Sequence, residues 1–242
     1  MSTDPQRWLS PRPVEGLRTR LRLVCSAHAG GGPQVFAGWA SALPQTVSLC
    51  PLRRPDHGDP GSDVHILAHQ ALEALLTLSP RPMVLYGHSL GAVIAFELAR
   101  LLDGRGMTPR LLIVSGREAP QSPRLLPPIA TLPDERFIAA LDERYGGIPT
   151  ELRDSPDLLI RLLPALRADL AASERYGLRP GPRLRCPLLA CHGRFDASVD
   201  SEGVDGWAVH TAAGFERHDF PGAHFFPFDP RVDFARWLAS RL

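Results

Sequence analysis

Short apolar runs bounded by glycine and proline alternate along the chain with stretches in which apolar residues recur at helical spacing. This alternation is typical of a parallel sheet covered by helices on both faces. The runs predict strands at Leu21–Cys25, Val47–Leu49, Met83–Tyr86, Leu111–Val114, Leu188–Cys191 and Phe215–Phe220. The pattern therefore predicts an α/β fold with a mostly parallel central sheet flanked by helices.

Helical periodicity fills the intervals between these runs. One apolar stripe follows Pro33, another follows Ser62 and Asp63, where a helix N-cap is expected, and a third begins near Val232. The segment Leu90–Leu102 is apolar on nearly every face. It is therefore predicted to be a buried central helix.

The segment from about Pro127 to Arg179 breaks the alternation, because helical patterns follow one another there without a strand between them. One helix is expected from Pro133 onward. A second is expected to have Ser155 as its N-cap and Pro156 at its first helical position. Since an interior proline costs a helix about 3 kcal/mol, Pro164 is expected to interrupt this second helix or to begin a new one.

The second of these helices is rich in apolar side chains: Leu158, Leu159, Ile160, Leu162, Leu163, Leu166 and Leu170. Such a surface suits either a lid over an apolar substrate channel or the core between two packed helices, and the residues alone favour neither. We predict a single domain over residues 1–242, with a lid insertion at about 127–179.

The segment Gly87-His88-Ser89-Leu90-Gly91 matches the pattern G-x-S-x-G, directly after a predicted strand and before the apolar helix. A serine on so sharp a turn needs a strained backbone, and the flanking glycines relieve crowding. The turn exposes the hydroxyl and puts the N–H of Leu90 at a helix N-terminus, where it can stabilise an oxyanion. We therefore interpret Ser89 as a nucleophile.

A serine hydroxyl needs a base to accept its proton, and in this kind of fold the partners follow in the order serine, acid, histidine. His224 follows the last predicted strand and precedes the last helix, so it is the expected base. Asp196 follows the fifth strand and is the favoured acid, which would orient the imidazole. Asp200 and Glu118 are the alternative acids.

A second oxyanion donor is expected from the loop after the first strand, His28-Ala29-Gly30-Gly31-Gly32. Consecutive glycines let backbone N–H groups approach a ligand closely, and the N–H of Ala29 is the candidate. The loop matches neither the dinucleotide pattern nor the P-loop pattern, so a phosphate-binding role is disfavoured.

Composition narrows the classes of function. The 242 residues carry 27 basic and 26 acidic side chains, which argues against a nucleic-acid or membrane-surface role. Every basic residue is arginine, and the four cysteines show no metal-ligand spacing. No apolar run suits a signal peptide or a membrane span, so we expect a cytoplasmic protein.

A group of acidic residues and histidines raises the question of a metal site: Asp56, His57, Asp59, Asp63, His65 and His69. His65 and His69 are four positions apart on a predicted helix. The residues between them are Ile-Leu-Ala, without the glutamate of a zinc protease motif. We predict no metal site.

Further stretches accompany the serine motif: Phe96-Glu97-Leu98-Ala99, Val114-Ser115-Gly116-Arg117, Leu166-Arg167-Ala168-Asp169 and Pro221 to Phe226. With them, the chain resembles over nearly its whole length a type II thioesterase, the free-standing editing hydrolase that accompanies modular polyketide synthases and nonribosomal peptide synthetases. It departs from that family locally, for example in having Ser26-Ala27 where Phe-Pro is usual.

The resemblance implies an α/β-hydrolase fold with a helical lid, the triad Ser89, Asp196 and His224, and an oxyanion hole formed by Leu90 and Ala29. It also implies that the substrates are short acyl or aminoacyl groups on the phosphopantetheine arm of an acyl carrier or peptidyl carrier protein. We expect a monomer that needs no cofactor.

Two other classes of function remain open. One is a carboxylesterase or general acyl-CoA thioesterase on the same scaffold, and the other is a non-catalytic binding protein. Carrier domains are generally acidic, so a carrier-domain thioesterase would dock through arginine. The candidates are Arg53, Arg54, Arg117 and Arg124.

Overall fold

The computed structural model describes residues 5–54, 63–123, 125–146 and 156–242. One sheet of six strands has the order β2-β1-β3-β4-β5-β6, and each neighbouring pair is parallel. The strands are β1 (Leu21–Ser26), β2 (Val47–Pro51), β3 (Met83–His88), β4 (Leu111–Ser115), β5 (Leu188–Gly193) and β6 (Phe215–Phe220). The predicted strands and the α/β-hydrolase class of fold are therefore confirmed.

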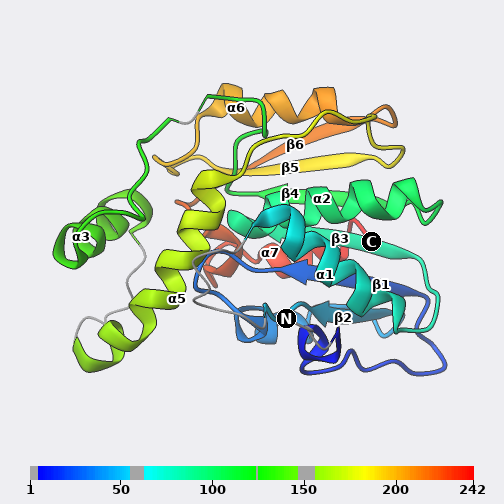
Figure 1. The fold of residues 1–242 in the computed structure, drawn as a ribbon. Coiled ribbons are helices and arrows are strands. Elements are labelled where there is room, and N and C mark those ends of the chain that lie inside the picture. Colours follow the sequence, from blue (N-terminus) through cyan, green and yellow to red (C-terminus); the bar gives the residue numbers. More distant parts are fainter. Residues whose placement is uncertain (1–4, 55–62, 124, 147–155) are drawn as a thin grey trace.

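Helices cover both faces of the sheet (Figure 1). On one face lie α1 (Val64–Leu76) and α2 (Leu90–Gly104), and on the other lies α7 (Phe234–Ala239). The shorter elements are η1 (Pro5–Leu9), η2 (Pro33–Trp39), α6 (Ser201–Asp205), η3 (Gly206–His210) and η4 (Phe226–Phe228). Because β1, β3 and β5 lie between neighbours and under helices, their residues are almost all buried, which explains their apolar runs.

The helix starts follow local chemistry. The side chain of Asp63 accepts hydrogen bonds from the backbone N–H groups of His65 and Ile66 and so caps α1, as the sequence predicts. Helix α2 is the expected buried central helix. The stripe after Pro33 forms a 3-10 helix, η2. In the part of the chain that the structure describes, no helix is long and apolar enough to cross a membrane.

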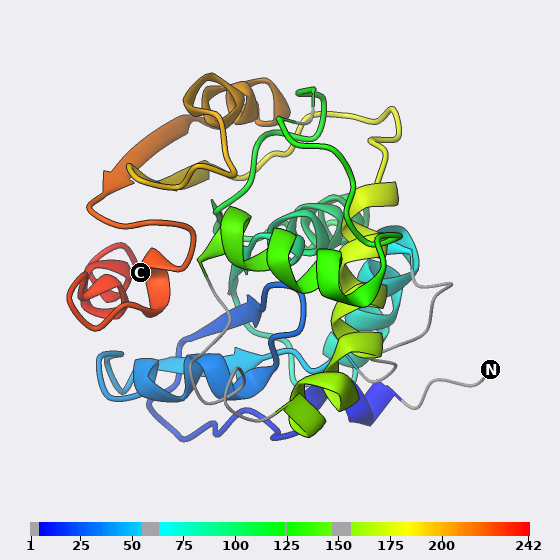
Figure 2. The ribbon, with the colours of Figure 1, turned by 90° about the vertical axis from the view of Figure 1, so that its left-hand side faces the viewer.

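Two helices lie beyond the carboxyl ends of the strands: α3 (Asp134–Tyr145) and α5 (Pro156–Arg175) (Figures 1 and 2). They share a small apolar core of their own: Ile129, Ala130, Phe137, Leu141, Leu163 and Leu170. Leu159 and Leu166 pack against this core, whereas Ile160 and Leu162 are 63% and 43% exposed. Part of the leucine-rich surface therefore forms a core between helices, and part of it faces outward. The predicted N-cap Ser155 lies outside the described residues, and α5 begins at Pro156 as predicted.

The prediction for Pro164 is wrong, because α5 runs through it without a break. Proline has no N–H, so the carbonyl of Ile160, four residues earlier, has no donor within the helix. Pro164 is exposed, and water can therefore donate to this carbonyl instead. The neighbouring Leu163 and, further on, Leu170 are buried against α3. Packing between the helices thus outweighs the local preference of proline.

Candidate active site

The turn between β3 and α2 holds Ser89 in a conformation that few side chains adopt, with φ of 56° and ψ of −115°. Glycines on both sides make this possible. A Cβ atom on Gly87 would lie 2.0 Å from the carbonyl oxygen of Gly91, and one on Gly91 would lie 2.0 Å from that of Ser26. Any larger residue would push the helix away from the sheet, so the G-x-S-x-G spacing follows from close packing of backbone.

The loops after β5 and β6 bring Asp196 and His224 together. His224 Nδ1 lies 2.8 Å from Asp196 Oδ2, and both residues are buried. The loops are joined by the hydrogen bond from Phe195 N–H to the Gly222 carbonyl, at 2.9 Å. A Cβ on Gly193 would lie within 2.7 Å of two carbonyl oxygens of the His224 loop, so this approach requires glycine.

Ser198 joins this pair, and sequence reasoning missed it. Its hydroxyl and its N–H donate to Asp196 Oδ1 at 2.6 and 3.0 Å, and the same hydroxyl lies 3.1 Å from His224 Nδ1. Burial raises the pKa of Asp196, but hydrogen bonds from His224 and Ser198 and the charge of His224 outweigh burial and lower that pKa. An ionised Asp196 can hold Nδ1–H of His224 and leave Nε2 to accept a proton.

The alternative acids occupy other places. Asp200 is exposed and caps α6, where its side chain accepts from Gly203 N–H at 3.1 Å. Glu118 Oε1 accepts the N–H of Asp200 at 3.0 Å. The carboxylate that the described contacts place against His224 is that of Asp196.

Ser89 and His224 line one cavity of about 100 Å³. Tyr145 of α3 and Leu170 of α5 are among the residues that line it. The ring of Tyr145 lies 4.7 Å from that of His224, measured between centroids. Burial raises the pKa of the Tyr145 phenol. Sequence reasoning missed Tyr145, because a single aromatic residue on a helix carries no motif.

The loop from which a second oxyanion donor is expected, His28 to Gly32, is called the oxyanion loop here together with Ala27 before it. It begins beside the start of α2, where a Cβ on Gly91 would lie 2.8 Å from the Ala27 carbonyl oxygen. The backbone N–H of Leu90 belongs to the first turn of that helix, where no carbonyl of the helix can accept it. Ala29 is half-buried. Within the loop, the N–H of Gly31 donates a hydrogen bond to the carbonyl oxygen of His28 at 3.0 Å. His28 Nδ1 lies 2.9 Å from the Ala29 carbonyl oxygen.

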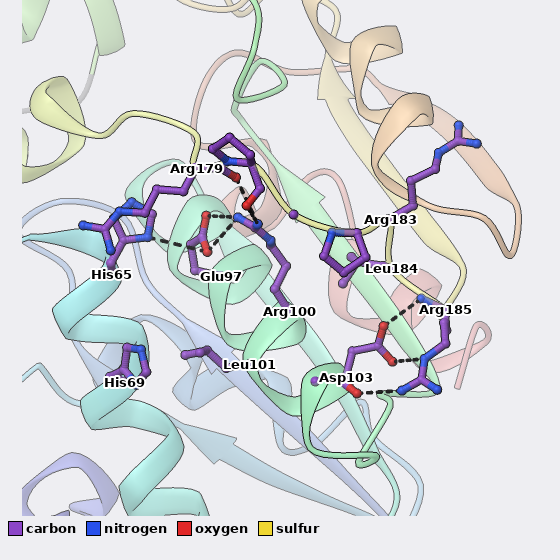
Figure 3. A pocket seen from close by; sticks show the side chains of 14 residues that line it. His65, His69, Glu97, Arg100, Leu101, Asp103, Arg179, Arg183, Leu184 and Arg185 are labelled. Carbon is purple, nitrogen blue, oxygen red and sulfur yellow. Dashed lines mark hydrogen bonds and ion pairs between the residues drawn. The ribbon is translucent and has the colours of Figure 1, made fainter.

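A larger cavity, of about 630 Å³, lies between α1, α2 and residues 179–185 (Figure 3). Its described lining includes neither Ser89 nor His224. Here His65 points toward Glu97, at 3.6 Å between Nδ1 and Oε2, and not toward His69. Among the described residues no group of three or more His, Cys, Asp or Glu could hold a metal ion. Asp56, His57 and Asp59 lie outside those residues.

The proposed docking arginines differ from one another. The expectation for Arg54 is wrong, since its side chain is buried and pairs with Asp169. Arg53 is exposed, and Arg117 is half-buried with Nη1 bonded to Ser173 of α5 at 2.8 Å. Arg124 lies outside the described residues.

A parallel sheet with a serine at a strained strand-to-helix turn, and with histidine and acid on later loops, defines a serine-hydrolase type of α/β protein. The protein-family model of the thioesterase domain matches residues 21–240. The chain therefore belongs to the thioesterase family and is a hydrolase.

Two solved structures resemble the whole chain. The type II thioesterase BorB from the borrelidin biosynthetic cluster is 33% identical, with a TM-score of 0.81, and the match covers 96% of this chain and 94% of BorB. The RedJ thioesterase from the prodiginine pathway of Streptomyces coelicolor is 34% identical, with a TM-score of 0.83, covering 97% and 92%. The resemblance to type II thioesterases is confirmed.

A curated relative, linear gramicidin dehydrogenase LgrE of Brevibacillus parabrevis, is 34% identical over 233 residues, 92% of this chain and 88% of its own. The loop after β1 of this chain does not match the glycine pattern of a dinucleotide site. A third solved structure, the type II thioesterase YbtT from the yersiniabactin NRPS/PKS biosynthetic pathway, is 31% identical with a TM-score of 0.80, and the match covers 95% of this chain and 94% of YbtT. These relatives associate the chain with NRPS/PKS biosynthesis.

Proposed function

We propose that this chain removes short acyl or aminoacyl groups from the phosphopantetheine arm of acyl carrier or peptidyl carrier domains. Ser89 is the nucleophile, His224 the general base and Asp196 the acid that orients it. The observation that carries the proposal is that Ser89, on its strained turn, borders the same cavity as His224, which is bonded to Asp196. Helices α3 and α5 serve as the lid of this cavity.

In the proposed mechanism His224 accepts the proton of the Ser89 hydroxyl as the oxygen attacks the thioester carbonyl carbon. The carbonyl oxygen takes the negative charge, which the N–H groups of Leu90 and Ala29 stabilise. The intermediate collapses, and the sulfur leaves with the proton from His224. A water molecule, giving one proton to His224, then attacks the acyl-enzyme carbonyl carbon. The bond from that carbon to the Ser89 oxygen breaks, His224 returns the proton to this oxygen, and the carboxylic acid leaves.

The size and chemistry of the cavity support a short acyl group. At about 100 Å³ it is well below the 300–1,000 Å³ that is usual for sites of larger ligands. Its walls carry charged side chains, among them Arg117, Glu118 and Glu174. A long alkyl chain would have to displace these walls, whereas a group of a few heavy atoms would not.

The proposal is tested by presenting one acyl group on a carrier domain and on coenzyme A and measuring kcat/KM at low and high salt. We expect the carrier-bound form to be preferred, with a preference that shrinks as salt is added. Arg53→Gln should weaken that preference. Arg110→Gln is the matched control, because Arg110 is exposed and lies before the amino end of β4, whereas Arg53 follows the carboxyl end of β2. Equal rates at every ionic strength would indicate a general acyl-thioester hydrolase.

A further inference from the structure

The side chain of Arg54, just past β2, is buried under the oxyanion loop and is 3% exposed. Nη1 donates to the Ala27 carbonyl at 2.9 Å, and Nη2 donates to the carbonyls of His28 and Gly31 at 2.8 and 2.9 Å. A single guanidinium thus holds three carbonyl oxygens of one short loop.

These bonds also fix the direction of an N–H group. The peptide bond is planar and trans, so the N–H of Ala29 points opposite to the carbonyl of His28. Because the His28 carbonyl points to Arg54, the Ala29 N–H points away from Arg54. The peptide cannot turn without breaking the bond between Arg54 and His28.

Helix α5 completes the arrangement through Asp169. Asp169 Oδ2 accepts from Arg54 Nη2 at 2.7 Å and from the Gly30 N–H at 2.8 Å. Gly30 has a φ of 73°, and a Cβ there would lie 2.9 Å from Cδ1 of Leu166, also on α5. The helix therefore contacts the loop by charge, by hydrogen bond and by close packing.

The ion pair links the position of α5 to the shape of the loop. A buried charge that loses its partner is strongly destabilised. If α5 moved away with Asp169, Arg54 would stay buried among carbonyls without its counter-ion, and Gly30 would lose its acceptor. The loop conformation and the docked position of α5 therefore favour each other.

We propose that Arg54 and Asp169 are positioning residues, which aim the Ala29 N–H at the developing oxyanion only while α5 is docked. This inference rests on the proposed function, because it needs Ser89 chemistry with an oxyanion intermediate. It gives Asp169 of α5 an indirect role in stabilising the transition state, in addition to the role of α5 in covering the cavity.

The test uses Asp169→Asn, Arg54→Met and the double variant of the full chain. Asp134→Asn is the matched control, since Asp134 also pairs with an arginine of α5, Arg167, but at the surface and away from the loop. The substrate is a short acyl thioester of N-acetylcysteamine, which needs no carrier docking. An end-point titration with a fluorophosphonate counts the sites with a reactive Ser89, so that kcat is expressed per active site.

Removing an oxyanion donor costs about 10²–10³ in kcat, so a misdirected donor should cost about 10–100-fold in each single variant, with little change in KM. The inhibition constant of a short trifluoromethyl ketone, whose adduct carries an oxyanion, should rise by the factor by which kcat/KM falls. The double variant should be no worse than Arg54→Met, because both residues act on one loop.

Several outcomes would overturn the inference. One is that Asp169→Asn and Arg54→Met both fold and have the same kcat per active site as the unsubstituted chain. Another is a loss that is fully explained by fewer labelled sites, which would make the pair a purely structural contact. A parent chain that neither hydrolyses the thioester nor reacts with the fluorophosphonate would overturn the proposed function itself, and the inference with it.

Discussion

The serine turn on one side of the candidate site is shaped by steric exclusion, whereas the oxyanion loop on the other side is held by hydrogen bonds to a buried charge. At the turn, backbone packs on backbone, and any Cβ on Gly87 or Gly91 would overlap a carbonyl oxygen. In the loop, carbonyl oxygens converge on Arg54, whose charge is matched by Asp169.

This difference decides what each side can do. A turn fixed by close packing has one arrangement as long as the sheet is folded. A loop fixed by a charge from another helix keeps its arrangement only while that helix is in place. The rigid side carries the proposed nucleophile, Ser89, and the side that depends on α5 carries the proposed second oxyanion donor, Ala29.

The largest effect is expected on the rigid side. Ser89→Ala should lower kcat for thioester hydrolysis by about 10⁵–10⁶-fold, because it removes the attacking oxygen. The fold should be unchanged, since alanine fits the same turn. Thioester hydrolysis and circular dichroism check both statements. A folded variant that keeps most of its activity would exclude Ser89 as the nucleophile.

Asp196→Asn should lower kcat by about 10³–10⁴-fold, because an amide can hold the imidazole in the wrong tautomer. Asp200→Asn and Glu118→Gln are the controls, since these side chains contact backbone N–H groups away from His224. Each control should lose far less. If Glu118→Gln proved the damaging change, the acid would lie after β4.

The elements that sequence reasoning predicted share one property, which is that their determinants are neighbours in the chain. Buried strands need continuous apolar runs, and the serine turn needs glycines two residues to either side, so both are visible as patterns. Asp196 and His224 were predicted on a different ground, because they follow strands in the order expected of this fold, and the structure places their side chains in contact.

The features that were missed depend on distant residues. Arg54 and Asp169 are 115 positions apart, and an arginine in a loop is ordinarily exposed. Arg54 was therefore counted among the candidate docking residues, which its burial contradicts. The prediction that Pro164 interrupts the helix was wrong for the same reason, because contacts between α3 and α5 outweigh the local tendency of proline to break a helix. Ser198 lies in a turn where serine is common, which left no signal for its contact with Asp196.

Gly91→Ala tests whether the serine turn is fixed by steric exclusion. A Cβ placed 2.0 Å from the Ser26 carbonyl oxygen forces helix and strand apart, which should lower the free energy of unfolding by about 3 kcal/mol or more. Gly104→Ala, at the other end of α2, is the matched control, because a Cβ there meets no atom within 4 Å. Urea unfolding measures both. Equal stabilities would show that the turn tolerates expansion and is not sterically fixed.

The smallest effect concerns pH and the histidines on the two sides, His88 at the turn and His28 in the loop. Burial lowers the pKa of His88 well below its ordinary value, and it lowers that of His28 to about 4. Below about pH 6.5 the unfolded chain binds protons at these positions that the folded chain does not, so stability falls as pH falls. For His28 this loss ends near pH 4, where the folded protein also binds the proton.

Each histidine should therefore reduce the free energy of unfolding by up to about 1.4 kcal/mol between roughly pH 7.5 and 5.5. His88→Gln and His28→Gln should each flatten the pH dependence of urea unfolding by that amount, whatever their effect at neutral pH. His69→Gln, on an exposed helix position, is the control for the loss of a histidine. The two variants should differ only at lower pH, because the His28 contribution levels off near pH 4, where the folded protein also binds the proton, whereas the His88 contribution continues to grow. Equal changes down to pH 4 would mean that the loop excludes water from His28 as completely as the close-packed turn excludes it from His88.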